Sequence, residues 1–359
     1  MINYDTALLG AFSDTEEILS YGAKVQVKPV PDSNASGIDP REKAIYLKSM
    51  ENYKAPETIK DHRDATGFPG LNLNTKTILT EKFTLSCEGR DVDIWEYRLR
   101  RTKHIDNAPA LIYIHGGSFF AGSAKFMENM CKYVCEKADC VVYNIEYSLA
   151  PELPFPAGFN DCMQVLQYIH SNASELGIDK NKICVSGDSA GAGLAASVAL
   201  CDTKKRVRYM ALLYPCVLMD VTDEQVVWDI NDFDIPENES ALIIPRLSLG
   251  RGDGKGNEAF MRTIGQMYLG DNHSLCFDKR VSPLRTEDVS HAPKTTVFTA
   301  EYDGLRPQGE AFAGKLQAAG IDARCVRYKG VFHAFSEKLG YVPQAQDSLD
   351  EIAKDILSL

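Results

Sequence analysis

Short apolar runs and segments of helical periodicity alternate along the chain from about residue 83 to its end. The runs are rich in β-branched residues, as expected for short strands that are covered on both faces. The alternation predicts an α/β fold in which a mostly parallel central sheet is flanked by helices. We expect strands near 110–115, 140–147, 182–187, 209–215, 295–300 and 323–328, preceded by a pair joined at Glu88-Gly89, and helices near 125–139, 161–171, 190–200, 308–319 and the carboxyl end.

Two segments interrupt this alternation of strands and helices. Residues 1–75 combine polar helical stretches with a loop and contain no strong strand, whereas residues 217–266 form an acidic, irregular insertion. Long insertions in a compact domain often act as lids or binding elements. We therefore expect 1–75 and 217–266 to pack together as a cap region, with 76–216 and 267–359 forming the catalytic core.

Composition narrows the classes of partner. Of the 359 residues, 44% are hydrophobic and 25% are charged, which is typical of a globular protein. The net charge of −11 disfavours phosphate backbones and anionic membranes, so no nucleic acid or membrane partner is expected.

No secretory signal or apolar run of about 20 residues is visible. The ten cysteines are scattered without a C-x-x-C pair. We expect a cytoplasmic protein with reduced thiols, no metal site and no cofactor.

The clearest chemical signal is the segment 187–191, Gly-Asp-Ser-Ala-Gly, which matches the pattern G-x-S-x-G. A predicted strand precedes it and a helix rich in small residues follows it, as a nucleophile elbow requires. In such a turn the serine is strained and exposed, and side chains two positions before and after it would collide. The pattern predicts Ser189 as a catalytic nucleophile.

A serine hydroxyl needs a base, and in this architecture the acid and then the histidine follow the serine along the chain. His333 leaves the last predicted strand, whereas His273 and His291 lie before the late strands and the other histidines, His62, His104, His115 and His170, precede Ser189. Asp303 leaves the preceding strand and is the expected acid, which would orient the imidazole. Glu301 is its nearest rival, although it still lies close to the strand.

A glycine pair follows the first buried strand, in the sequence His115-Gly116-Gly117-Ser118. Glycines there allow backbone N–H groups to turn toward an oxygen that develops negative charge. We expect an oxyanion hole with N–H donors from Gly117, Ser118 and Ala190, and with Gly116 shaping the loop.

Taken together, these motifs resemble those of the bacterial hormone-sensitive-lipase-like esterases over roughly residues 80–355. HGGSF resembles the HGGG motif of that family, GDSAGAGLA its nucleophile motif, AEYDGLRPQGE its acid motif and GVFHAF its histidine loop. Ser118 and Ala192 depart from the family pattern, because each stands where the family has glycine. The resemblance implies an α/β-hydrolase fold with a helical cap, and by analogy a possible homodimer.

The expected function is hydrolysis of short-chain carboxylic esters through an acyl-enzyme, with a small-molecule ester as the partner. An amidase or peptidase could use the same three residues. A non-catalytic small-molecule receptor on this scaffold is a third reading, although such receptors commonly lose a catalytic residue. The alcohol half of the ester, an acetylated sugar for example, is left open by the sequence.

Overall fold

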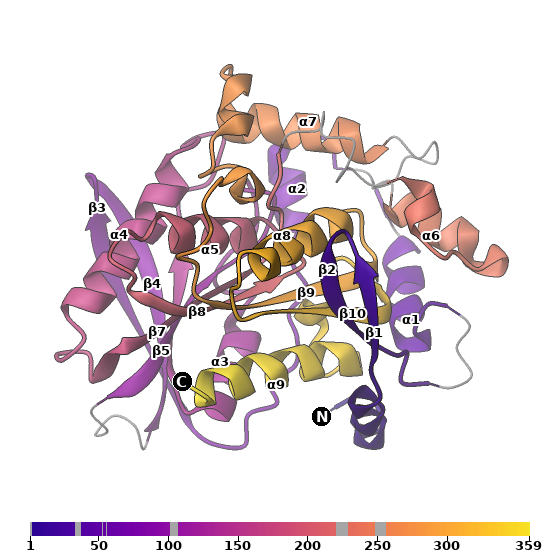
Figure 1. Ribbon diagram of the computed structural model, residues 1–359, viewed down its shortest axis with the longest axis horizontal. Helices are drawn as coiled ribbons and strands as arrows, with labels where there is room; N and C mark the ends of the chain where they lie inside the picture. Colours follow the sequence, from indigo (N-terminus) through magenta and orange to yellow (C-terminus); the bar gives the residue numbers. More distant parts are fainter. Residues whose placement is uncertain are drawn as a thin grey trace.

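The structure is a computed structural model that describes residues 2–32, 37–51, 53–54, 56–100, 107–219, 229–247 and 256–359, without the side chains of 256–260. Within these residues one sheet of ten strands forms the centre of the molecule, in the order β1-β2-β10-β9-β8-β7-β5-β6-β4-β3 (Figure 1). The strands are β1 (Glu16–Ser20), β2 (Ala23–Lys28), β3 (Ile78–Cys87), β4 (Arg90–Leu99), β5 (Ala108–Ile114), β6 (Val141–Glu146), β7 (Ile178–Asp188), β8 (Val207–Leu213), β9 (Lys294–Tyr302) and β10 (Ala323–Phe332).

The middle of the sheet is parallel. β10, β9, β8, β7, β5 and β6 run in one direction, while β4 and β3 at one edge and β1 at the other are antiparallel to their neighbours. All six strands expected from the apolar runs are present, and the hairpin turns at Glu88-Gly89 as predicted. The predicted α/β fold is therefore confirmed. Parallel strands align their carboxyl ends at one edge, which places the loops after β5, β7, β9 and β10 close together.

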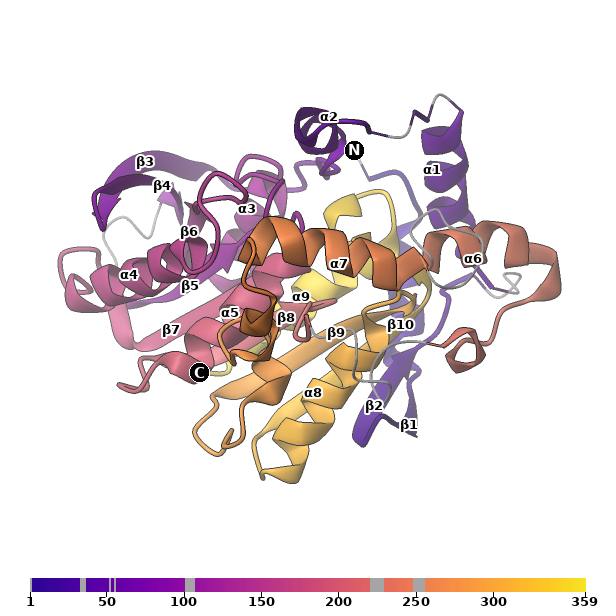
Figure 2. The same ribbon diagram turned by 90° about the horizontal axis from the view of Figure 1, so that it is seen from above.

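Helices cover both faces of the sheet. α3 and α9 pack together on one face, with α4, α5 and α8 on the other (Figures 1 and 2). The helices are α1 (Pro40–Met50), α2 (Ile59–Ala65), α3 (Glu128–Ala138), α4 (Ala157–Ser171), α5 (Ala190–Cys201), α6 (Ser240–Leu247), α7 (Gly256–Leu269), α8 (Arg306–Ala318) and α9 (Pro343–Leu357). The five expected helices are all present. None of the helices in the described ranges is long and apolar enough to cross a membrane.

The expectation that residues 1–75 contain no strong strand is wrong. β1 and β2 form a hairpin, and β2 pairs in parallel with β10, where Val25 lies opposite Cys325. Val25 and Val27 are buried, whereas β1 is a short edge strand with the charged residues Glu16 and Glu17 exposed. β2 pairs with β1 and also with β10, a strand about 300 positions later, and a local pattern does not reveal that second partner.

Two distant parts of the chain meet beside the sheet. Ile38, before α1, is buried in one apolar cluster with Phe233, Ile243 and Leu247 from the insertion. The N–H of Ile38 also donates to Glu239 Oε2 at 2.6 Å. The contacts join the N-terminal segment to α6, and Figure 2 shows α1, α2, α6 and α7 grouped on one side of the molecule.

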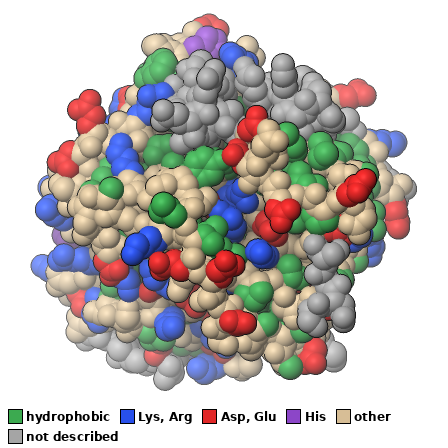
Figure 3. Space-filling model, turned by 45° about the vertical axis from the view of Figure 1, so that its right-hand side comes forward, with side chains coloured by type: hydrophobic (Ala, Val, Ile, Leu, Met, Phe, Trp, Pro, Cys, Tyr) green, Lys and Arg blue, Asp and Glu red, His purple; other side chains and the backbone are tan. Residues whose placement is uncertain are grey.

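The surface next to this group is mixed in charge. On the face in Figure 3, acidic and basic side chains lie among apolar ones, and the described residues show no large patch of one sign. The acidic side chains of the described residues are therefore not gathered in one place on this face.

Candidate active site

Ser189 occupies a strained turn between β7 and α5. Its backbone has φ of 54° and ψ of −119°, a region that L-residues rarely adopt. A Cβ added to Gly187 or Gly191 would lie 2.5 or 2.1 Å from the carbonyl oxygen of Ile114. Both positions are thus restricted to glycine by the neighbouring strand β5, which is the steric reason expected for an elbow.

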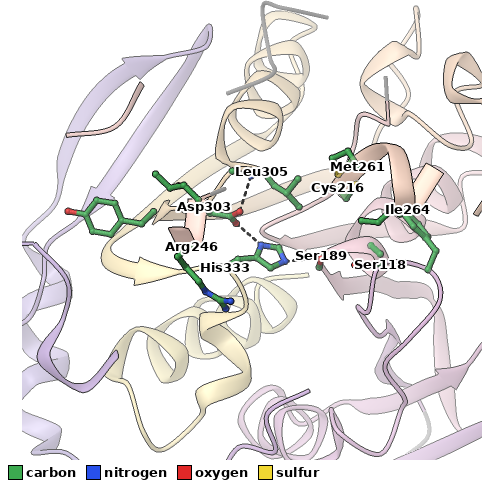
Figure 4. A pocket seen from close by; sticks show the side chains of 14 residues that line it. Ser118, Ser189, Cys216, Arg246, Met261, Ile264, Asp303, Leu305 and His333 are labelled. Carbon is green, nitrogen blue, oxygen red and sulfur yellow. Dashed lines mark hydrogen bonds and ion pairs between the residues drawn. The ribbon is translucent and has the colours of Figure 1, made fainter. Parts of the chain in front are cut away.

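Three side chains from separate loops form a continuous chain of hydrogen bonds. Ser189 Oγ lies 2.9 Å from His333 Nε2, and His333 Nδ1 lies 2.8 Å from Asp303 Oδ2 (Figure 4). Asp303 is buried, and its Oδ1 accepts the N–H of Leu305 at 2.9 Å. Because the carboxylate is held from two sides, it orients the imidazole toward the serine hydroxyl.

The rival carboxylate points elsewhere. Glu301 Oε2 accepts the N–H of Gly330 at 2.7 Å, and burial raises the pKa of this carboxyl. The geometry therefore brings Asp303, rather than Glu301, to His333. Of the other histidines, His115 is the one that lies in the loop beside the site, and His104 is outside the described residues.

The loop after β5 is held against the elbow. Asp188 Oδ1 accepts the N–H of Gly116 and the hydroxyl of Tyr113, both at 2.9 Å. Gly117 has φ of +121°, and a Cβ there would lie 2.0 Å from the carbonyl oxygen of Ala121. Ser118 follows with φ of +55°, so this departure from glycine is accommodated in the left-handed region. Two cavities have Ser189 in their walls. Ser118 lines both of them, Gly117 lines one and Ala190 lines the other.

The buried side chain of His115 packs against the backbone of this loop. Its side chain is fully buried, with Nδ1 2.7 Å from the carbonyl oxygen of Gly116 and the ring stacked on Tyr147 at 4.5 Å. Burial lowers the pKa of His115 to about 4, so the imidazole is neutral near pH 7. Its Nε2 lies 3.8 Å from Glu146, but a neutral ring makes no ion pair there.

Two cavities open on either side of Ser189 and His333. Cavity 1, of about 130 Å³, is mainly apolar, and its walls include Phe119, Met261, Ile264 and Leu305. Cavity 2, of about 320 Å³, is more polar, and its walls include Glu42, Tyr46, Arg246 and Glu337. Arg246 and Ser118 belong to both cavities.

The pKa values of two acids near Ser189 are raised. Burial raises the pKa of Asp188 to about 6, against the opposing effect of the hydrogen bonds from Tyr113 and Gly116. Burial, and then the charge of Asp188, raises the pKa of Glu337 to about 7. Neither acid was singled out from the sequence. Asp188 occupies a variable position of G-x-S-x-G, and nothing in the local pattern reveals its burial.

Comparisons with known proteins show the family of this chain. Residues 111–337 match the family model described as alpha/beta hydrolase fold. The chain belongs to the α/β-hydrolase family. The matched residues run from β5 to Glu337, so they include all the residues described above as surrounding Ser189, except Glu42 and Tyr46 of α1.

Relatives within the α/β-hydrolase family are similar over most of this chain. An arylesterase of Saccharolobus solfataricus is 31% identical over 70% of this chain and 76% of its own length. The carboxylesterase NlhH of Mycobacterium tuberculosis is 27% identical over 68% of this chain and 71% of its own. The solved structure of a hyperthermophilic esterase from Pyrobaculum calidifontis is 26% identical, with a TM-score of 0.71 over 90% of this chain and 98% of that one.

Proposed function

We propose that this α/β-hydrolase is a carboxylic ester hydrolase with Ser189 as nucleophile, His333 as base and Asp303 as the orienting acid. The observation that carries the proposal is the hydrogen-bonded chain from Ser189 through His333 to Asp303, at 2.9 and 2.8 Å, set on a strained elbow. The names of its relatives, arylesterase and carboxylesterase, support the ester as the substrate class.

The reaction proceeds in two stages. Ser189 Oγ attacks the ester carbonyl carbon while His333 Nε2 takes its proton, which forms a tetrahedral intermediate. N–H groups of Gly117, Ser118 and Ala190 stabilise the oxyanion, and Gly116 shapes the loop. The C–O bond to the alcohol then breaks as His333 returns the proton to the leaving oxygen. Water, deprotonated by His333, attacks the acyl-enzyme, and the acid leaves as Ser189 regains its proton.

The cap limits the size of the acyl group. Within the segments 1–75 and 217–266 we assign α1, α2, α6 and α7 to the cap region, since Ile38 and α6 pack together and Leu247, Met261 and Ile264 line cavity 1. β1 and β2, in contrast, belong to the central sheet. An apolar space of about 130 Å³ next to the nucleophile favours short acyl chains. The larger and more polar cavity 2 is left for the alcohol half of the ester.

The test is hydrolysis of p-nitrophenyl esters from acetate to palmitate by the wild type, Ser189→Ala and Ser186→Ala. Ser186 lies on β7, just before the turn that holds Ser189, and its buried hydroxyl has no hydrogen-bond partner among the described residues, so its variant is a matched control. Ser189→Ala should lower kcat by roughly 10⁵–10⁶, and Ser186→Ala should not. Activity that peaks with long chains would overturn the assignment of cavity 1. An unchanged rate in Ser189→Ala would overturn the mechanism.

A further inference from the structure

Arg246 projects from α6 into the space between the two cavities. It lines cavity 1 together with Ser189 and His333, and it also lines cavity 2. Figure 4 shows its guanidinium on the side of the His333 ring that faces away from Leu305. A cap residue therefore places a permanent positive charge beside the proposed nucleophile and base.

Among the described residues, the guanidinium packs on aromatic rings and forms no ion pair with a carboxylate. Its centre lies 5.9 Å from the ring of Tyr46 and 5.9 Å from that of Phe332. Its Nε is buried and has no hydrogen-bond partner among the described residues. By contrast, Arg63, on α2, is paired with Glu152.

The acids in the wall of cavity 2 are engaged with other groups. Glu42 forms a buried ion pair with Lys338. Asp188 Oδ1 accepts from Tyr113 and Gly116. Glu337 Oε2 accepts the N–H of Phe68 at 2.9 Å, and burial weakens its ionisation near pH 7. None of these three acids pairs with Arg246, so within the described part of the chain its positive charge is available to a molecule that enters the cavity.

We propose that Arg246 binds an anionic group, such as a carboxylate, on the alcohol half of the ester. The inference rests on the proposed function. Tyr46 and Phe332, over which the guanidinium lies, belong to cavity 2 and not to the small apolar cavity 1. An anion that reaches the guanidinium from cavity 2 leaves cavity 1 free for the acyl chain. Arg246 is then a specificity-determining residue that selects acidic esters over neutral ones.

The experiment compares 4-acetoxybenzoate, which carries a carboxylate on its alcohol half, with neutral phenyl acetate. The readout is the ratio of kcat/KM for the anionic ester to that for the neutral one, because intrinsic reactivities cancel when the ratio is compared between variants. Arg246→Gln should lower this ratio by about 10–100-fold, the size expected for a lost charged hydrogen bond. Arg246→Lys keeps the charge and should lower it less. Arg208→Gln, an exposed arginine on β8, removes one charge elsewhere and should leave the ratio unchanged.

A second pair of substrates tests where the anion lies. Mono-4-nitrophenyl glutarate carries the carboxylate on its acyl half and is compared with 4-nitrophenyl butyrate. A drop in the ratio for Arg246→Gln with this pair alone would place the anion on the acyl half and overturn the proposal, as would unchanged ratios with both pairs. A wild type that hydrolyses none of the four esters would instead overturn the proposed function, and this inference with it.

Discussion

Asp303 Oδ2 lies 2.8 Å from His333 Nδ1, and the same carboxylate accepts the N–H of Leu305 through Oδ1. The second bond fixes the carboxylate on the loop after β9, so that the imidazole on the loop after β10 is held with Nε2 toward Ser189. The position of His333 is therefore set by β9 and β10, two neighbouring parallel strands that end at the same edge of the sheet.

Asp303→Asn should lower kcat for p-nitrophenyl acetate by about 10⁴, because the amide can hold the wrong tautomer of His333. The matched control is Glu301→Gln, in which the amide oxygen can still accept the N–H of Gly330. We expect this variant to keep a kcat close to that of the wild type. Equal losses in the two variants would contradict the assignment of Asp303.

Gly117→Ala should lower kcat by roughly 10²–10³, the effect of losing one oxyanion donor. A Cβ at Gly117 would meet the carbonyl oxygen of Ala121 at 2.0 Å, so the loop must move. Gly22→Ala is the control, since Gly22 also has positive φ, +79°, but has no atom within 4 Å of an added Cβ. It should cost about 1–2 kcal/mol of stability without changing kcat. A Gly117→Ala enzyme with full kcat would place the hole elsewhere.

His115 should make folding stability depend on pH. Its pKa is lowered to about 4 by burial, from about 6.5 in the unfolded chain, so the unfolded state binds the proton first as pH falls. The contribution of the neutral His115 ring to the unfolding free energy is fully present above pH about 6.5 and is lost as the pH falls toward 4. The difference in unfolding free energy between wild type and His115→Asn should fall by roughly 3 kcal/mol from pH 7 to pH 4 in urea titrations. A difference that stays constant over this range would show that His115 is not buried in its neutral form.

Lys338 and Glu42 should matter to stability as a pair. They join the loop after His333 to α1, and the carboxyl of Glu42 is fully buried. Lys338→Met leaves that carboxylate unpaired and should cost about 3–5 kcal/mol of unfolding free energy. The double variant Lys338→Met and Glu42→Leu should recover much of this loss, because no buried charge remains. Losses that simply add in a double-mutant cycle would show that the two charges do not interact.

Whether a feature could be predicted from the sequence depends on the range of the interactions that produce it. Gly187, Ser189 and Gly191 could be assigned from sequence because a strand, a tight turn and a helix are local patterns. His333 and Asp303 followed from their order and from their positions after late strands. The strand β2 was missed because its pairing with β10 involves residues about 300 positions apart. Arg246 and Glu337 gave no local signal, since their role depends on which cavity they face.

By itself, the sequence determined the α/β alternation and the tight turn at 187–191, and it predicted residues for the base, the acid and the oxyanion loop, because each depends on short-range periodicity or sterics. Only the tertiary structure brought Asp303 rather than Glu301 to His333, joined α1 and the insertion around Ile38, and placed Arg246 between the two cavities. It also decided the raised pKa of Asp188 and the lowered pKa of His115. Burial and side-chain direction arise from contacts between distant segments, and they exist only when the chain is folded.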